Sequence, residues 1–145
     1  MKKSILTSLV FIFAISAGFA QNKTDVLPQE SKALIKKHFP DVMVKSAERE
    51  KDLINMGNGE LYEVVLANGI KMDFNKSGGL TEIESRDDIE IPEGLLPGNI
   101  VSYVNDNYGD LYIVSWEDDK NDQEIELSDG TDLEFDSNGK FLKED

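Results

Sequence analysis

The chain has 145 residues, with 29 Asp and Glu against 15 Lys and Arg, and a formal net charge of −14. A surface this negative repels the phosphates of nucleic acids and of anionic lipids, so we expect neither as a partner. The absence of cysteine excludes disulfides, a lipid attached to cysteine and a thiol nucleophile.

The N-terminal segment has the pattern of a cleaved secretory signal peptide. Residues 2–3 are basic, residues 5–17 are apolar, and residues 18–20 form a small-residue cleavage site. The apolar run is shorter than the roughly 20 residues that span a bilayer. We therefore expect a signal peptide over 1–20, cleavage after Ala20, a flexible leader over 21–26, and a periplasmic or secreted protein with no membrane insertion after cleavage.

Two short amphipathic helices are predicted, each after a Leu-Pro pair. The segments QESKALIKKHF after Pro28 and GNIVSYVNDNY after Pro97 carry apolar residues at helical spacing. Proline suits the first turn of a helix, where its missing N–H costs nothing. Each helix is followed by a predicted strand, over residues 42–47 and 111–116, in which apolar side chains alternate.

Two hairpins complete each half, and the side-chain alternation fixes their loops. A three-residue loop at Ala67-Asn68-Gly69 pairs Val64 with Met72 and Tyr62 with Phe74, which puts the apolar residues of both strands on one face. Such a loop needs a left-handed residue at its third position, where Gly69 stands. The same pattern recurs at Lys76-Ser77-Gly78, Ser128-Asp129-Gly130 and Ser137-Asn138-Gly139, so Phe74 should face Leu80 and Phe135 should face Phe141.

The second half repeats the first. Residues 62–84 match residues 123–145 at one constant offset, which aligns Gly69 with Gly130 and Phe74 with Phe135. We interpret residues 27–84 and 96–145 as tandem repeats joined by a linker over 85–95. One repeat alone would be marginal in size, so both should share one folding unit. The predicted fold class is α+β, with two helix-plus-four-antiparallel-strand repeats in one two-layer domain.

The chain also resembles a known family. Leu-Pro, a helix ending at Phe-Pro or Tyr-Gly, a strand, and then YEVVLANGIKMDFNKSGGLTEIE or QEIELSDGTDLEFDSNGKFLKED are similar to the PepSY-like proteins of the β-lactamase-inhibitor-like (BLIP-like) fold. The resemblance extends over residues 27–145. It implies a periplasmic location and protein binding or inhibition, and it supplies no catalytic residues.

The sheet face opposite the helices is the predicted functional surface. Strict alternation places on it Met43, Lys45, Ala47, Glu63, Val65, Lys71, Asp73, Ile83, Tyr112, Val114, Trp116, Glu124, Glu126, Asp132, Glu134 and Leu142. Aromatic residues are enriched where proteins bind one another. The predicted protein-binding site is therefore Tyr112, Val114 and Trp116, bordered by Val65, Glu124 and Glu126. The alternative is that these side chains only stabilise the sheet, or that a loop at residues 53–56 covers them.

Acidic clusters raise the question of calcium, most of all Asp118, Asp119, Asn121 and Asp122. Calcium takes six to eight oxygen ligands, and the sequence contains no D-x-[DN]-x-[DN]-G run. We therefore predict no specific metal site and no cofactor. An acidic protein that binds or buffers calcium in the periplasm is the alternative function.

Catalysis is not predicted. The one histidine, His38, falls at the end of the first helix, where a helix residue facing the C-terminal dipole is the simpler interpretation. No serine has a positioned base in the sequence pattern. We expect a non-catalytic exported module that binds an unknown protein or peptide of the cell envelope, with inhibition of an enzyme as one form of that function.

Overall fold

The computed structural model describes residues 23–49, 60–87 and 89–145. The predicted signal peptide, the first two residues of the leader and the proposed covering loop at 53–56 lie outside these ranges. Within them, no helix is long and apolar enough to cross a bilayer.

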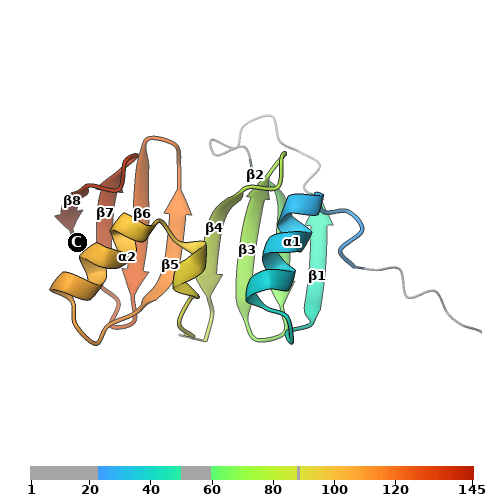
Figure 1. The fold of residues 1–145 in the computed structure, drawn as a ribbon, viewed down its shortest axis with the longest axis horizontal. Helices are drawn as coiled ribbons and strands as arrows, with labels where there is room; N and C mark the ends of the chain where they lie inside the picture. The colour runs from blue at the N-terminus through green and yellow to red at the C-terminus, as the bar shows by residue number, and fades with distance from the viewer. Residues whose placement is uncertain (1–22, 50–59, 88) are drawn as a thin grey trace, which may run out of the picture.

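Both predicted helices are present and lie on one face of the sheet (Figure 1). α1 is Gln29–His38 and α2 is Gly98–Asn107, each with a proline at its N-cap. The two helices bury Ile35, Ile100 and Val104 toward the strands. A short 3-10 helix, η1 (Glu93–Leu95), precedes α2.

The strands form one eight-stranded sheet in sequence order, and every neighbouring pair is antiparallel. They are β1 (Val44–Arg49), β2 (Glu60–Leu66), β3 (Ile70–Asn75), β4 (Leu80–Ser85), β5 (Ile113–Asp118), β6 (Asp122–Leu127), β7 (Asp132–Asp136) and β8 (Phe141–Glu144). The α+β class is confirmed, with two helices over an antiparallel sheet. β4 pairs directly with β5, so the strands before and after η1 and α2 belong to the same sheet.

The predicted hairpin registers are confirmed. Val64 pairs with Met72 and Tyr62 with Phe74, while Phe135 pairs with Phe141. Gly69 has a φ of 90°, the left-handed backbone that the three-residue loop requires. These registers place fully buried side chains, among them Val64, Met72, Phe74 and Phe135, between the sheet and the helices.

The assumption of strict alternation fails where the strand pairing shifts. The shifts lie between Val44 and Ser46 (β1–β2), Glu60 and Tyr62 (β2–β3), Asp73 and Phe74 (β3–β4), Ile113 and Ser115 (β5–β6), and Glu134 and Phe135 (β7–β8). An extra residue in one strand reverses the facing of everything beyond it. Trp116, Ile83 and Ala47, all expected on the outer face, therefore pack with the core beneath the helices.

Candidate functional site

The prediction that Tyr112, Val114 and Trp116 form an exposed aromatic centre on the outer face is wrong. Trp116 is 6% exposed and packs in the core, and its Nε1 donates a 3.0 Å hydrogen bond to Oε1 of Gln123. Val114 lies at the shift in β5 pairing and is 4% exposed. Tyr112 precedes β5 and is half-buried, in a narrow hollow that it lines with Leu96 and Val101. Aromatic side chains therefore do not form the middle of the outer face.

A row of carboxylates crosses the outer face instead. Directly paired residues of neighbouring strands lie on one face of a sheet, about 4.5–5.5 Å apart at their Cβ atoms. The chain of direct pairs runs through Glu48, Glu63, Asp73, Glu82, Glu117, Glu124 and Glu134 and ends at Lys143. We call the seven acids the carboxylate row. It spans β1 to β7, with one acid from each strand.

A second row of directly paired residues runs beside it on the same face, two residues away along each strand. It contains Val65, Lys71, Glu84, Ser115, Glu126 and Asp132. Val65, Glu124 and Glu126 of the predicted site thus do lie on the outer face, among acids rather than around aromatic rings. The outer face is predominantly acidic and faces away from both helices.

One lysine lies among the three acids of the β2–β4 part of the carboxylate row and offsets part of their charge. Nζ of Lys71 lies 2.8 Å from Asp73, 3.7 Å from Glu82 and 3.8 Å from Glu63. Burial by itself would lower the pKa of Lys71, but the hydrogen bond to Asp73 and the charges of the three carboxylates raise it above its ordinary value. The sheet surface therefore holds an ammonium group among three acids.

Glu82 stands at the junction of the two halves, opposite both Asp73 and Glu117. Its burial raises its pKa to about 7, and the charges of Asp73 and Glu117 act in the same direction, while Lys71 acts against them. Like charges directly opposite one another destabilise a sheet. Repulsion between carboxylates therefore destabilises the centre of the carboxylate row, where Glu82 lies between Asp73 and Glu117.

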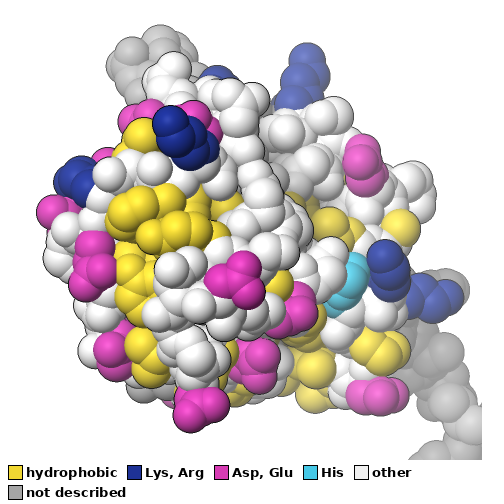
Figure 2. All heavy atoms as spheres, turned by 60° about the vertical axis from the view of Figure 1, so that its left-hand side comes forward, with side chains coloured by type: hydrophobic (Ala, Val, Ile, Leu, Met, Phe, Trp, Pro, Cys, Tyr) yellow, Lys and Arg dark blue, Asp and Glu magenta, His cyan; other side chains and the backbone are white. Residues whose placement is uncertain are grey.

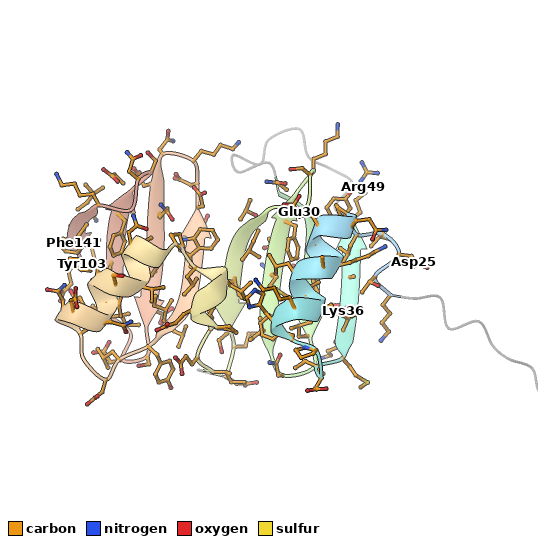
Figure 3. All side chains as sticks on the ribbon, in the orientation of Figure 1. Asp25, Glu30, Lys36, Arg49, Tyr103 and Phe141 are labelled. Atoms are coloured by element: carbon orange, nitrogen blue, oxygen red, sulfur yellow. The ribbon has the colours of Figure 1, made fainter. Side chains whose placement is uncertain are left out.

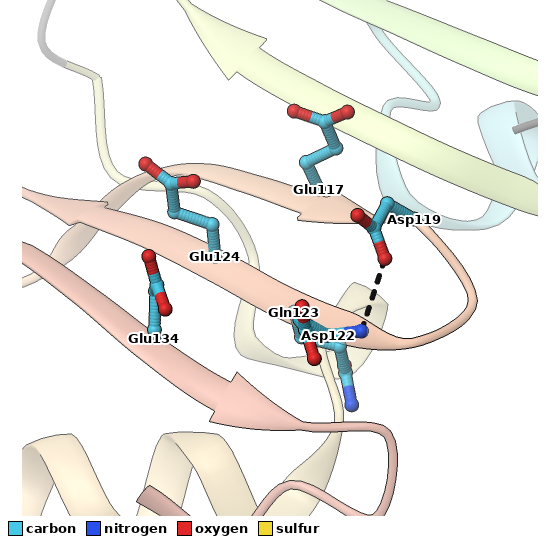
Figure 4. A pocket seen from close by; sticks show the side chains of 6 residues that line it. All are labelled: Glu117, Asp119, Asp122, Gln123, Glu124 and Glu134. Carbon is cyan, nitrogen blue, oxygen red and sulfur yellow. Dashed lines mark hydrogen bonds between the residues drawn. The ribbon is translucent and has the colours of Figure 1, made fainter. Parts of the chain in front are cut away.

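The β5–β7 part of the row borders a hollow (Figure 4). The hollow has a volume of about 230 Å³ and is lined by Glu117, Asp119, Asp122, Gln123, Glu124 and Glu134. Partial burial, with Asp132, Glu134 and Glu117 nearby, raises the pKa of Glu124. We call this feature the acidic hollow.

The acids suspected of binding calcium are engaged in a turn. Oδ1 of Asp119 accepts hydrogen bonds from the backbone N–H groups of Asn121 and Asp122, and these bonds lower the pKa of Asp119. Oδ1 of Asp118 accepts from the N–H of Lys120. In the described part of the chain, no cluster of three or more acids or histidines is arranged to hold a metal ion.

An aromatic cluster that the sequence pattern did not reveal lies at the edge of the sheet. The rings of Tyr103 on α2 and Phe141 on β8 stack at 4.7 Å between centroids (Figure 3). Tyr108 donates a 2.6 Å hydrogen bond to Glu144, which together with partial burial raises the pKa of Tyr108 to about 12. Figure 2 shows hydrophobic side chains gathered at this end of the molecule. One feature of the sequence could have indicated this cluster: where the first half has Leu80, the matching position of the second half has the aromatic residue Phe141.

The positions of Glu82 and Glu117 were also missed. Strict alternation put them on the helix face, because each stands beyond a shift in strand pairing. Glu63 and Glu124 were placed correctly, because the pairing around each of them is regular: β2–β3 from Tyr62 to Val65, and β6–β7 throughout. The continuous row depends on the β4–β5 pairing, for which the sequence gives no local signal.

Comparison with known proteins gives one family. Residues 60–143 match the family described as "Putative beta-lactamase-inhibitor-like, PepSY-like". No curated protein is significantly similar to the chain.

Three solved structures from Bacteroides are similar in sequence and fold. A "putative periplasmic protein" from Bacteroides vulgatus is 34% identical, with a TM-score of 0.73 over 84% of this chain and 92% of that one. A "putative calcium-regulated periplasmic protein" from Bacteroides thetaiotaomicron is also 34% identical, with a TM-score of 0.73 over 82% and 90%. A "putative periplasmic protein of unknown function" from Bacteroides vulgatus is 32% identical, with a TM-score of 0.74 over 84% and 94%.

Proposed function

The chain belongs to the PepSY-like, β-lactamase-inhibitor-like family, and within it we propose a non-catalytic binding module that takes a basic segment of another protein on its outer sheet face. The observation that carries the proposal is the carboxylate row, with one acid from each of seven neighbouring strands. Complementary charge selects partners and speeds their encounter. A lysine- or arginine-rich segment is the partner that this face fits.

A second copy of the chain fits less well than a foreign partner. The formal net charge of −14 makes two copies repel each other. The basic residues of α1, Lys32, Lys36 and Lys37, lie on the opposite side of the molecule from the row, so joining them to it would be a head-to-tail contact and not a symmetric dimer. A basic protein or peptide of the cell envelope avoids both costs.

The proposal extends to location and origin. A cleaved signal peptide over residues 1–20 would deliver the module to the periplasm, the location named for the similar Bacteroides proteins. The two halves, each a helix followed by four strands, would be tandem copies of one ancestral unit. Inhibition of an enzyme would be one form of this binding, and the fold alone does not establish it.

A peptide titration tests the proposal. A fluorescently labelled lysine octapeptide is titrated with the wild-type protein and with a triple variant, Glu117→Gln, Glu124→Gln and Glu134→Gln. Removing three adjacent charges should weaken binding by about tenfold or more, which corresponds to about 1.4 kcal/mol. Added salt should weaken wild-type binding as well, because the attraction is screened.

The matched control removes three exposed acids away from the outer face, Glu30→Gln, Asp106→Asn and Asp110→Asn. This variant has the same net charge as the triple variant. It should nevertheless retain its affinity for the octapeptide within about twofold, because the acids that it lacks do not lie on the outer face. Equal losses in the two variants would show attraction to net charge alone and would defeat the proposal.

Calcium binding is the second candidate, and a specific observation favours it. One of the similar structures is named "calcium-regulated", and carboxylates are the ligands that calcium prefers. Calorimetric titration of the metal-free protein with calcium chloride distinguishes the candidates. A saturable transition with defined stoichiometry, lost in the triple variant, would support calcium as the ligand of this face.

A further inference from the structure

The two edges of the sheet lie at opposite ends of the molecule (Figure 1). In the described part of the chain, no strand pairs with the outer edge of β1 or of β8. An unpaired edge presents N–H and C=O groups with which a further strand can pair. The sheet itself indicates which strand fits each edge, because β1 and β8 have counterparts in its middle.

Those counterparts are β5 and β4, which pair with each other where the two halves meet. β8 begins at Phe141, which matches Leu80 at the start of β4, and β1 corresponds to β5, since each follows the helix of its half and has six residues. The pairing of β1 with β2 and of β5 with β6 even shifts at the same place, just after the first residue of the strand. The two free edges therefore correspond to the two edges that join in the β4–β5 pair.

Apolar side chains near the free edges are exposed, whereas their counterparts near the β4–β5 pair are not. Leu142 on β8 is 49% exposed, and the matching Thr81 on β4 is 7% exposed. Val26, before α1, is 48% exposed, and the matching Leu95, before α2, packs against the core. A second copy placed as β5 is placed on β4 would cover these apolar side chains, which favours association.

The charges on the free edges complement each other. Glu82 pairs with Glu117 in the β4–β5 register, and the same register between copies puts Lys143 of one copy opposite Glu48 of the next. Opposite charges in directly paired positions stabilise a sheet. Lys143 already bridges Glu134 and Asp145, and an ammonium group with three donors can take a third acid. Charged edges discourage pairing with unrelated strands, so this match also selects the partner.

We propose that copies of the chain associate head to tail, with β8 of one copy pairing antiparallel with β1 of the next, as β4 pairs with β5 inside each copy. The inference rests on the correspondence of the two halves and not on the binding of a basic segment. It uses the edges of the sheet, so the outer face stays open to the basic partner proposed above. A head-to-tail contact leaves one free edge at each end, so association continues past two copies or closes into a ring.

Two features oppose this association and make it weak. The formal net charge of −14 makes copies repel each other. Lys23 donates a 2.9 Å hydrogen bond to the carbonyl oxygen of Lys45 on β1, but this bond is exposed, so its exchange for a strand bond costs little. Salt screens the repulsion between whole copies. It should therefore strengthen association, whereas it should weaken the binding of the lysine octapeptide.

Sedimentation velocity of the wild-type protein over a series of concentrations, at about 0.15 M salt, tests the proposal without any peptide. The weight-average mass should rise with concentration beyond that of two copies. A mass that stays at one copy, or that stops at two, would overturn head-to-tail pairing and would leave the proposed binding of a basic segment untouched.

Charge reversal tests the register. Glu48→Lys places two lysines opposite each other between copies and should weaken association by about threefold or more, although it makes the net charge less negative. Glu126→Lys is the control, since it changes the net charge equally on β6, away from both edges, and should not weaken association. Equal effects of the two variants would show that net charge alone governs association and would defeat the proposal.

A second reversal should restore the contact. Lys143→Glu alone should also weaken association, whereas the double variant Glu48→Lys with Lys143→Glu has opposite charges between copies again, at the wild-type net charge, and should recover wild-type association within about twofold. A double variant as weak as the single ones would overturn the proposed register. If Lys143→Glu does not fold, as judged by circular dichroism, the comparison of Glu48→Lys with Glu126→Lys decides alone.

Discussion

The indole Nε1 of Trp116 donates a 3.0 Å hydrogen bond to Oε1 of Gln123, and both side chains are 6% exposed. Nε2 of Gln123 in turn donates to the carbonyl oxygen of Asp136 at 3.3 Å. Buried polar groups are stable only when they are paired. The single tryptophan of the chain therefore joins β5 to β6 and to the end of β7, and its role is structural.

Removing this donor should destabilise the fold. Trp116→Phe leaves Oε1 of Gln123 buried without its donor and should lower the free energy of unfolding by about 1–3 kcal/mol. Trp116→Ala adds a cavity and should lower it by about 3–5 kcal/mol. Urea unfolding followed by circular dichroism measures both. Leu142→Ala, at an exposed position, is the control, and a Trp116→Phe value as small as the control would contradict the assigned role.

The position of Trp116 also shows where the alternation of side chains along a strand stops predicting which face of the sheet they occupy. The period-two pattern correctly aligned β2 with β3, because Val64 and Met72 pair directly and the hairpin glycine fixes the register. It failed within β5, where the residues from Ile113 to Trp116 contain neither glycine nor proline to mark an irregularity. Such an irregularity depends on the pairing strands, so one strand's sequence does not reveal it.

In the candidate site as well, some residues could be placed from the sequence and others could not. Glu63 and Glu124 could be placed from the sequence because the strand pairing next to each of them follows the register that the hairpin glycine sets. Glu82 and Glu117 could not, because they lie beyond shifts in pairing and face each other only through the β4–β5 contact between the halves. Continuity of the carboxylate row is therefore a tertiary property, while its composition is visible in the sequence.

Glu82 should make stability depend on pH. Its burial, supported by Asp73 and Glu117, raises its pKa from an ordinary value of 4.5 to about 7. The folded state then holds this proton more tightly than the unfolded state does, so stability falls as pH rises between these two values. With allowance for solvent screening, the loss should be of the order of 1 kcal/mol.

The Glu82→Gln variant isolates this contribution. It cannot ionise, so its free energy of unfolding should change less than that of the wild type between about pH 5 and about pH 8. Glu30→Gln, at an exposed position on α1, should keep the wild-type slope. Urea titrations at several pH values give the slopes, and parallel curves for Glu82→Gln and wild type would refute the assignment.

Two hairpin glycines should differ in their tolerance of alanine. Gly130 and Gly139 have φ values of 86° and 75°, so alanine is strained at both and should cost about 1–2 kcal/mol. A Cβ at Gly130 meets nothing within 4 Å, whereas one at Gly139 would overlap the side chain of Asn99. That side chain donates a 2.5 Å hydrogen bond to the carbonyl oxygen of Asn138.

Gly139→Ala should therefore cost about 1 kcal/mol more than Gly130→Ala, since it displaces Asn99 and its hydrogen bond as well. Thermal unfolding of the two variants under identical conditions measures the difference. Because the backbone strain is matched, equal melting temperatures would show that the hairpin end does not depend on its contact with α2.

Lys71 should be the most important cation of the outer face. Lys71→Met keeps the length of the side chain but removes the ammonium, which leaves Asp73, with a side chain only 9% exposed, without its 2.8 Å partner. The three acids then face one another unneutralised, and the free energy of unfolding should fall by about 1–3 kcal/mol near neutral pH. The loss should shrink toward about pH 5, because removal of the lysine raises the pKa of Glu82 further and a protonated Glu82 no longer repels Asp73.

Lys143→Met is the matched comparison on the second half. Lys143 also bridges two acids, Glu134 and Asp145, but its side chain is 51% exposed, and solvent-exposed pairs contribute little. Urea unfolding of both variants at about pH 5 and about pH 8 should therefore show a large, pH-dependent loss for Lys71→Met and a small one for Lys143→Met. Equal losses would contradict the expectation that the less exposed lysine contributes more to stability.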